Sequence, residues 1–165
     1  MDKNSKIKAL FFDIDGTLVS FQTHRIPQST VEALEKAKQN GVKIYISTGR
    51  PIILITNLGQ IEHLIDGYIT TNGARCFVEN HTVCQCPILR SDVEKVIEAA
   101  DRDDYSVIVV GEKHLAIHHL TPVVEKIFVE GLGVDSLDFQ TNIDDLKDED
   151  ILQLTPFCSV EQESE

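Results

Sequence analysis

The feature that most constrains the fold is a short apolar run that ends at a polar turn. Residues 7–12 read Ile-Lys-Ala-Leu-Phe-Phe, and the sequence Asp-Ile-Asp-Gly-Thr follows directly at positions 13–17. An apolar run of this length with a turn at its end is typical of a strand that is buried inside a sheet. We therefore predict a buried strand over Ile7–Phe12, with Asp13 and Asp15 just beyond its carboxyl end.

Helix and strand patterns alternate after this first strand. Ser29 and Glu32 have the spacing of a capping box and predict the start of a helix, which the turn signal Asn40-Gly41 would end. The next predicted elements are a strand over 42–47, a helix from Pro51 to about Leu58 and a strand over 67–70. This order of strand, helix, strand, helix, strand is the signature of a parallel α/β sheet.

Beyond residue 73 the pattern changes to that of an α+β unit. Ser91 and Glu94 form a second apparent capping box and predict a helix there. The other expected elements are a hairpin of strands over 75–78 and 82–86, strands over 105–110 and 114–118, a helix from Thr121 to about Gly131 or Gly133, an acidic loop over 144–150 and a strand over 151–154. We predict two domains, over residues 1–82 and 83–165.

Two carboxylates lie two residues apart at the end of the first predicted strand. Ligands of open α/β sheets bind beyond the carboxyl ends of the strands, which is where Asp13 and Asp15 fall. One carboxylate can attack phosphorus and form an aspartyl phosphate, while the other protonates the leaving oxygen and later activates water. A divalent cation between the first carboxylate and the phosphate would offset their negative charges. These residues therefore predict metal-assisted phosphoryl transfer.

A candidate anion site follows the second predicted strand. The sequence Ser-Thr-Gly-Arg-Pro at positions 47–51 offers a hydroxyl group and backbone N–H groups at the start of a predicted helix. Thr48 and Gly49 are the candidate phosphate-binding residues. Arg50 is equally suited to pair with a substrate or with a carboxylate of the protein.

Charge and hydropathy exclude some partners. The formal net charge of −12 argues against nucleic acid, because binding to a phosphate backbone needs Lys and Arg. No apolar run approaches the roughly 20 residues of a membrane span, and the polar start MDKNSKIK is unlike a signal peptide. We expect a cytoplasmic location, with neither a membrane nor a nucleic-acid partner.

The cysteines and histidines show no regular metal-ligand spacing. Cys84 and Cys86 lack the second ligand pair that zinc sites use, and we expect packed or half-exposed thiols. Most of the six histidines are expected at the surface. His118 and His119 would point to opposite faces if both lie in a strand.

Three motifs together resemble the haloacid dehalogenase-like superfamily, and within it the Cof-like hydrolases. The resemblance runs through FFDIDGTLV, ISTGR and ITTNGA, over about the first half of the chain. It implies a Rossmann-like α/β core, Mg²⁺ and an aspartyl-phosphate intermediate, with residues from about 84 onward forming part of an α+β cap. The implied roles are nucleophile and metal ligand for Asp13, acid/base and metal ligand for Asp15, phosphate binding for Thr48 and Gly49, and substrate binding for Arg50, Asn72 and Gly73.

The chain departs from the family pattern in its later motifs. Members need a lysine in the third motif and an acidic pair in the fourth, and no residues here match either one. We therefore expect a fragment of a longer phosphatase that acts on small phosphorylated metabolites such as sugar phosphates, nearly inactive as it stands. Its first strand would be an exposed sheet edge, which would favour a homodimer.

Other readings of the same residues stay open. A phosphomutase would use the same aspartates with a sugar hydroxyl group as acceptor. A phosphate- or metal-binding pseudoenzyme would bind without turnover. A response-regulator receiver domain ranks last, because its acidic pair and its phospho-acceptor lie on different strands.

Overall fold

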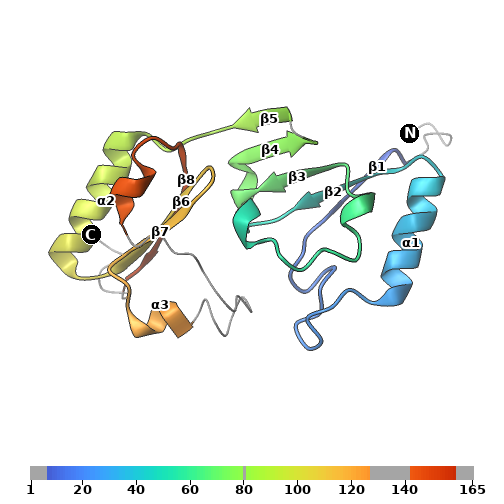
Figure 1. Ribbon diagram of the computed structural model, residues 1–165, viewed down its shortest axis with the longest axis horizontal. Coiled ribbons are helices and arrows are strands. Elements are labelled where there is room, and N and C mark those ends of the chain that lie inside the picture. Colours follow the sequence, from blue (N-terminus) through green and yellow to red (C-terminus); the bar gives the residue numbers. More distant parts are fainter. Residues whose placement is uncertain (1–6, 80, 127–141, 159–165) are drawn as a thin grey trace, which may run out of the picture. The chain divides into compact units, whose positions relative to one another are not determined.

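The first half of the chain folds around a five-stranded sheet (Figure 1). The structure is a computed structural model that describes residues 7–79, 81–126 and 142–158. The chain divides into two compact units, Met1–Gln85 and Cys86–Glu165. Each unit has its own sheet and its own apolar core, so each is described by itself.

The sheet of the first unit combines parallel and antiparallel strands in the order β1-β2-β3-β4-β5. The three parallel strands are β1 (Ala9–Phe12), β2 (Lys43–Ser47) and β3 (Gly67–Thr70). The antiparallel hairpin of β4 (Arg75–Val78) and β5 (His81–Gln85) extends the sheet. The predicted parallel α/β arrangement of the first three strands is confirmed.

The first strand is less buried than predicted. Among the described residues β1 pairs only with β2, so it is an edge of the sheet, as the family resemblance implied. Phe11 is 59% exposed and stacks on Tyr45 of β2, with ring centroids 5.0 Å apart. The prediction of a buried strand over Ile7–Phe12 is therefore wrong in part, because the strand begins at Ala9, three of its residues are half-buried and Phe11 is exposed.

The core of the first unit lies between the sheet and helix α1 (Gln28–Gln39). Val31 and Leu34 of the helix are buried, as are Ile44 and Ile46 of β2. The predicted Ser29–Glu32 capping box is absent, because the helix already begins at Gln28 behind an extended Pro27, which places Ser29 inside the first turn.

The prediction of a second helix over residues 51–58 is also wrong. Only a short 3₁₀ turn, η1 (Ile52–Leu54), forms there, and a second one, η2 (Glu62–Leu64), precedes β3. The β-branched residues Ile52, Ile53 and Ile55 lose side-chain freedom in a helix, which lowers the helix propensity of this segment.

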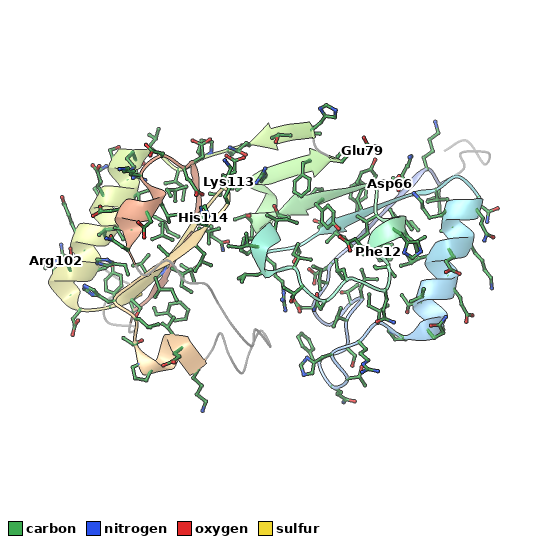
Figure 2. All side chains as sticks on the ribbon, viewed as in Figure 1. Phe12, Asp66, Glu79, Arg102, Lys113 and His114 are labelled. Carbon is green, nitrogen blue, oxygen red and sulfur yellow. The ribbon has the colours of Figure 1, made fainter. Side chains whose placement is uncertain are left out.

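Asp66, the residue before β3, links helix α1 to the sheet and is labelled in Figure 2. Its carboxylate accepts hydrogen bonds from Lys38 Nζ at 2.7 Å, from Lys43 Nζ at 2.8 Å and from the Ile44 amide at 2.8 Å. Burial raises the pKa of Asp66, but the bonds from the two lysines and the amide outweigh burial and lower the pKa to about 2.

We expect Asp66→Asn to destabilise the first unit by about 2 kcal/mol at neutral pH. Because the folded pKa of Asp66 lies below its ordinary value, this stabilisation is full above pH 4 and is lost as the pH falls toward 2. Urea unfolding at several pH values measures it. Asp92→Asn, which removes an exposed pair with Lys95, is the control and should change the free energy of unfolding much less. If the difference in free energy of unfolding between Asp66→Asn and the unaltered protein did not depend on pH, the lowered pKa of Asp66 would not be its cause.

The second unit is a three-stranded antiparallel sheet covered by one long helix. Strand β6 (Ser106–Gly111) is central and buried along its whole length, between β7 (Leu115–His118) and β8 (Ile151–Phe157). Helix α2 (Arg90–Asp103) contributes Val93 and Ala100 to the core. Helix α3 (Pro122–Lys126) and the 3₁₀ turn η5 (Ile143–Leu146) complete the described part of this unit.

Several predictions for the second unit need correction. Helix α2 begins at Arg90 without a side-chain cap, so the Ser91–Glu94 capping box does not form. The last strand reaches Phe157 rather than ending at Leu154. Part of the predicted acidic loop forms η5. The expected end of the helix after Thr121 lies outside the described residues.

Candidate active site

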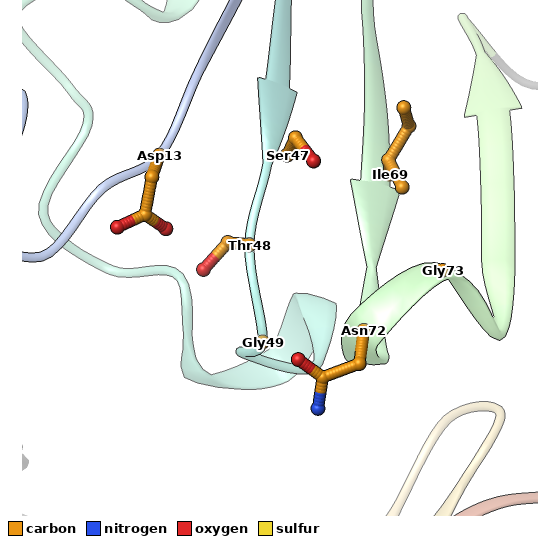
Figure 3. A pocket seen from close by; sticks show the side chains of 7 residues that line it. All are labelled: Asp13, Ser47, Thr48, Gly49, Ile69, Asn72 and Gly73. Atoms are coloured by element: carbon orange, nitrogen blue, oxygen red, sulfur yellow. The ribbon is translucent and has the colours of Figure 1, made fainter.

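A cavity of about 380 Å³ opens at the carboxyl ends of the parallel strands (Figure 3). It is lined by Asp13 after β1, by three residues at the end of β2 and by three from β3 and the turn behind it. The lining residues are Asp13, Ser47, Thr48, Gly49, Ile69, Asn72 and Gly73. Five of the seven predicted site residues therefore meet in one cavity.

Backbone hydrogen bonds fix the turn that presents Thr48. Its amide donates to the Ile69 carbonyl at 2.9 Å, and its own carbonyl accepts from the Asn72 amide at 3.3 Å. The Thr48 hydroxyl group accepts from the Arg50 amide at 3.2 Å, although the residue is only 6% exposed. The hydroxyl group of Thr48 and the carboxylate of Asp13 point into the same space in Figure 3. A group bound there would contact both.

The turn behind β3 holds three consecutive residues in left-handed backbone conformations. The φ angles of Thr71, Asn72 and Gly73 are 54°, 53° and 95°. This conformation is costly for a β-branched residue such as Thr71, and backbone strain of this kind concentrates at functional sites. The strained turn brings the Asn72 side chain so close to Gly49 that an added Cβ on the glycine would lie 3.0 Å from Asn72 Oδ1.

Asp15 and Arg50 do not line the cavity but pair with each other. Arg50 Nε and Nη2 donate to the two carboxylate oxygens of Asp15 at 2.7 and 2.8 Å, and Nη1 donates to the Leu54 carbonyl at 2.9 Å. The Arg50 side chain is 10% exposed and that of Asp15 is 34% exposed. Of the two roles that the sequence left open for Arg50, the structure contains the pair with a carboxylate of the protein.

The two aspartates differ in their surroundings. Asp13 is exposed, Asp15 is half-buried, and Ile14 between them is completely buried. The turn after them is tight, with Gly16 at a φ of +75° and its amide donating to the Val19 carbonyl at 2.9 Å. Asp13 is thus open to a ligand, whereas Asp15 is held by an internal partner.

The donor atoms at this site suit Mg²⁺. The exposed carboxylate of Asp13 is an oxygen ligand of the kind that Mg²⁺ prefers, and Mg²⁺ keeps several waters beside one or two carboxylates and substrate phosphates. Because Arg50 engages both carboxylate oxygens of Asp15, that residue has its backbone carbonyl to offer rather than its side chain. The residues present therefore fit the predicted cation.

Sequence reasoning missed three contributors to the site. Ser47 and Ile69 line the cavity, and the Leu54 carbonyl anchors Arg50. Ser47 and Ile69 could have been found from their places at the ends of predicted parallel strands, where cavities form. No local signal marks Leu54, because its role is that of a backbone atom.

A parallel-stranded sheet with a carboxylate, a threonine hydroxyl group and a tight glycine turn at one edge has the groups that can bind and accept a phosphoryl group. A family model described as haloacid dehalogenase-like hydrolase matches residues 10–165. The chain belongs to this family.

Solved structures and curated relatives agree with that assignment. The chain is 42% identical, with a TM-score of 0.84, to the subclass IIB sugar phosphatase BT4131, over 95% of this chain and 61% of that one. It is 30% identical, with a TM-score of 0.81, to the phosphatase BT1666 of Bacteroides thetaiotaomicron, over 99% of this chain and 61% of that one. "Putative phosphatase YkrA" of Bacillus subtilis is 28% identical over 94% of this chain and 59% of the relative.

The chain spans about three fifths of the length of these relatives. Within its described part, every helix is too short or too polar to cross a membrane.

Proposed function

We propose that the protein takes part in the magnesium-dependent hydrolysis of small phosphorylated metabolites, with sugar phosphates as the substrate class. The observation that carries this proposal is the meeting of Asp13, Thr48 and Asn72 in one cavity at the ends of three strands. Its family and its similarity to a sugar phosphatase support the choice of reaction and substrate.

The proposed reaction has two steps. An oxygen of Asp13 forms a bond to phosphorus while the bond from phosphorus to the sugar oxygen breaks, and protonated Asp15 gives its proton to that oxygen. Water then attacks phosphorus, Asp15 takes a proton from the water, and the bond from phosphorus to Asp13 breaks. The products are the sugar and inorganic phosphate.

The other site residues hold the phosphate and the substrate. The hydroxyl group of Thr48 and the backbone at Gly49 would donate to phosphate oxygens, and Asn72 and Gly73 would contact the rest of the substrate. Mg²⁺, held by Asp13 and the backbone carbonyl of Asp15, would offset the charge of the phosphate.

Arg50 has a switching role in this scheme. Asp15 can act as an acid only when one of its oxygens carries a proton, yet Arg50 engages both oxygens. A phosphate anion competes well for a guanidinium group. We propose that substrate binding draws Arg50 toward the phosphate and releases Asp15.

Assembly and location complete the proposal. The first unit acts as the catalytic core, and the second belongs to a cap that selects the substrate. The exposed edge of β1, with Phe11 at 59% exposure, fits pairing with a second copy, and sedimentation at rising protein concentration measures that pairing. A cytoplasmic location fits a substrate made by metabolism.

The direct test is a product assay on the protein translated from the complete reading frame that contains these residues. We expect inorganic phosphate to appear from a panel of hexose phosphates only when Mg²⁺ is present. Conversion of one sugar phosphate into its isomer without phosphate release would identify a phosphomutase instead. Binding of phosphate without turnover would indicate a phosphate-binding pseudoenzyme.

A further inference from the structure

Two histidines and an aspartate meet at one corner of the second unit. Asp101 lies near the end of helix α2, His118 is the last residue of β7, and His119 follows it. One carboxylate oxygen, Asp101 Oδ1, is 2.7 Å from His118 Nε2 and 3.1 Å from His119 Nε2. One atom from each of the three side chains lies within 4.8 Å of the other two.

The backbone at His119 creates this arrangement. Neighbouring residues of a strand normally point to opposite faces, as the sequence predicted for this pair. His119 instead has a φ of 54°, and its ring stacks on that of His118 with centroids 4.1 Å apart. That prediction was conditional on both histidines lying in a strand, and His119 lies beyond the end of β7, so the condition is not met. Both rings turn their Nε2 atoms toward Asp101.

A buried hydrogen bond holds the left-handed residue in place. The hydroxyl group of Ser106, a residue that is 1% exposed, donates to the carbonyl of His119. The same hydroxyl oxygen lies 3.1 Å from the hydroxyl oxygen of Thr121. The backbone of His119 is thus anchored to a buried residue of the second unit.

The three donor atoms have the chemistry and spacing of a transition-metal site. Zinc bonds of about 2.0–2.2 Å in a tetrahedron place ligand atoms roughly 3.4 Å apart. The separations from Asp101, 2.7 and 3.1 Å, are shorter, so the three side chains would move apart slightly to admit the ion. Two imidazoles with a carboxylate suit zinc rather than Mg²⁺. The carboxylate of Asp104 is fully exposed and lies 4.0 Å from His119 Nδ1, which is beyond hydrogen-bonding distance.

We propose that Asp101, His118 and His119 bind one zinc ion, with the fourth position open to water. The ion would tie the end of helix α2 to the end of β7. This site consists of residues of the second unit alone and takes no part in the proposed phosphatase chemistry.

The test is a zinc titration of the whole 165-residue protein, with Mg²⁺ in excess, followed through the NMR signals of its six histidine rings. We expect the signals of His118 and His119 to shift together and to saturate at one equivalent of Zn²⁺. Those of His81, which is exposed in β5, should not follow. This readout separates the site from zinc bound at the cysteines or at Asp13.

Variants then assign the ligands. His119→Gln and Asp101→Asn should each weaken Zn²⁺ binding by about 100-fold or more. His81→Gln is the matched control and should leave the affinity unchanged.

Two results would overturn the proposal. One is ring signals of His118 and His119 that respond to pH but not to excess Zn²⁺ in the unaltered protein. The other is a Zn²⁺ affinity that His119→Gln leaves unchanged. Neither measurement depends on phosphatase activity, so this site and the proposed function can fail separately.

Discussion

Replacing Asp13 by asparagine is expected to lower the rate of sugar-phosphate hydrolysis by about 10⁴-fold, or ~5.5 kcal/mol in the activation barrier. The amide has nearly the shape of the carboxylate but cannot form the covalent bond to phosphorus, and it is a poorer ligand for Mg²⁺. The measurement is kcat/KM for phosphate release in the product of the complete reading frame.

The exposure of Asp13 makes this variant informative. Because the side chain is exposed, the substitution should leave the fold and the free energy of unfolding nearly unchanged. Asp145→Asn, which alters another exposed carboxylate, is the matched control and should retain full activity. An Asp13→Asn variant that kept more than a tenth of the activity would rule out the nucleophile.

The second large effect is expected at Asp15 and should depend on the leaving group. Asp15→Asn removes the general acid, so hydrolysis of a hexose phosphate should fall by about 10³-fold. An aryl phosphate such as p-nitrophenyl phosphate leaves as a stable anion without a proton, and its first step should hardly change. We expect a burst of one equivalent of nitrophenolate followed by slow turnover. The second step is slow because no general base activates the water that hydrolyses phosphorylated Asp13.

The Arg50→Lys variant tests whether Asp15 acts as an acid and base or only holds Arg50 in place. Lysine cannot form the two parallel hydrogen bonds that Arg50 makes with Asp15, but it leaves the carboxyl group in place. If Asp15 only held Arg50 in place, Asp15→Asn and Arg50→Lys would each lower the rates with hexose phosphate and with p-nitrophenyl phosphate by similar factors. A burst that appears with Asp15→Asn and not with Arg50→Lys would assign the acid and base role to Asp15.

The sequence predicted the parts of the molecule that depend on local pattern. The parallel strands β1, β2 and β3 follow from apolar runs with turns at their ends, and strand ends must gather at one edge of a parallel sheet. That rule predicts that Asp13 and Thr48 lie at one edge of the sheet, whereas Asn72 was predicted from the family resemblance; the structure brings all three into one cavity.

The parts that depend on distant contacts could not be predicted. The pair of Arg50 with Asp15 joins residues 35 positions apart, and either of two partners satisfied the sequence equally well. The stacked rings of His118 and His119 depend on a left-handed residue held by Ser106, which strand alternation would not suggest. Both helix starts were predicted from capping boxes, but the helices begin before the serines.

The proposed reaction requires that Asp13 carries the phosphoryl group between its two steps. The most direct measurement is the mass of peptides from the Asp15→Asn variant, quenched in acid during turnover of p-nitrophenyl phosphate. We expect one added phosphoryl group on the peptide that contains Asp13, removed by hydroxylamine as expected of an acyl phosphate. Continued turnover with no phosphoryl group on that peptide, or with the group on another residue, would contradict it.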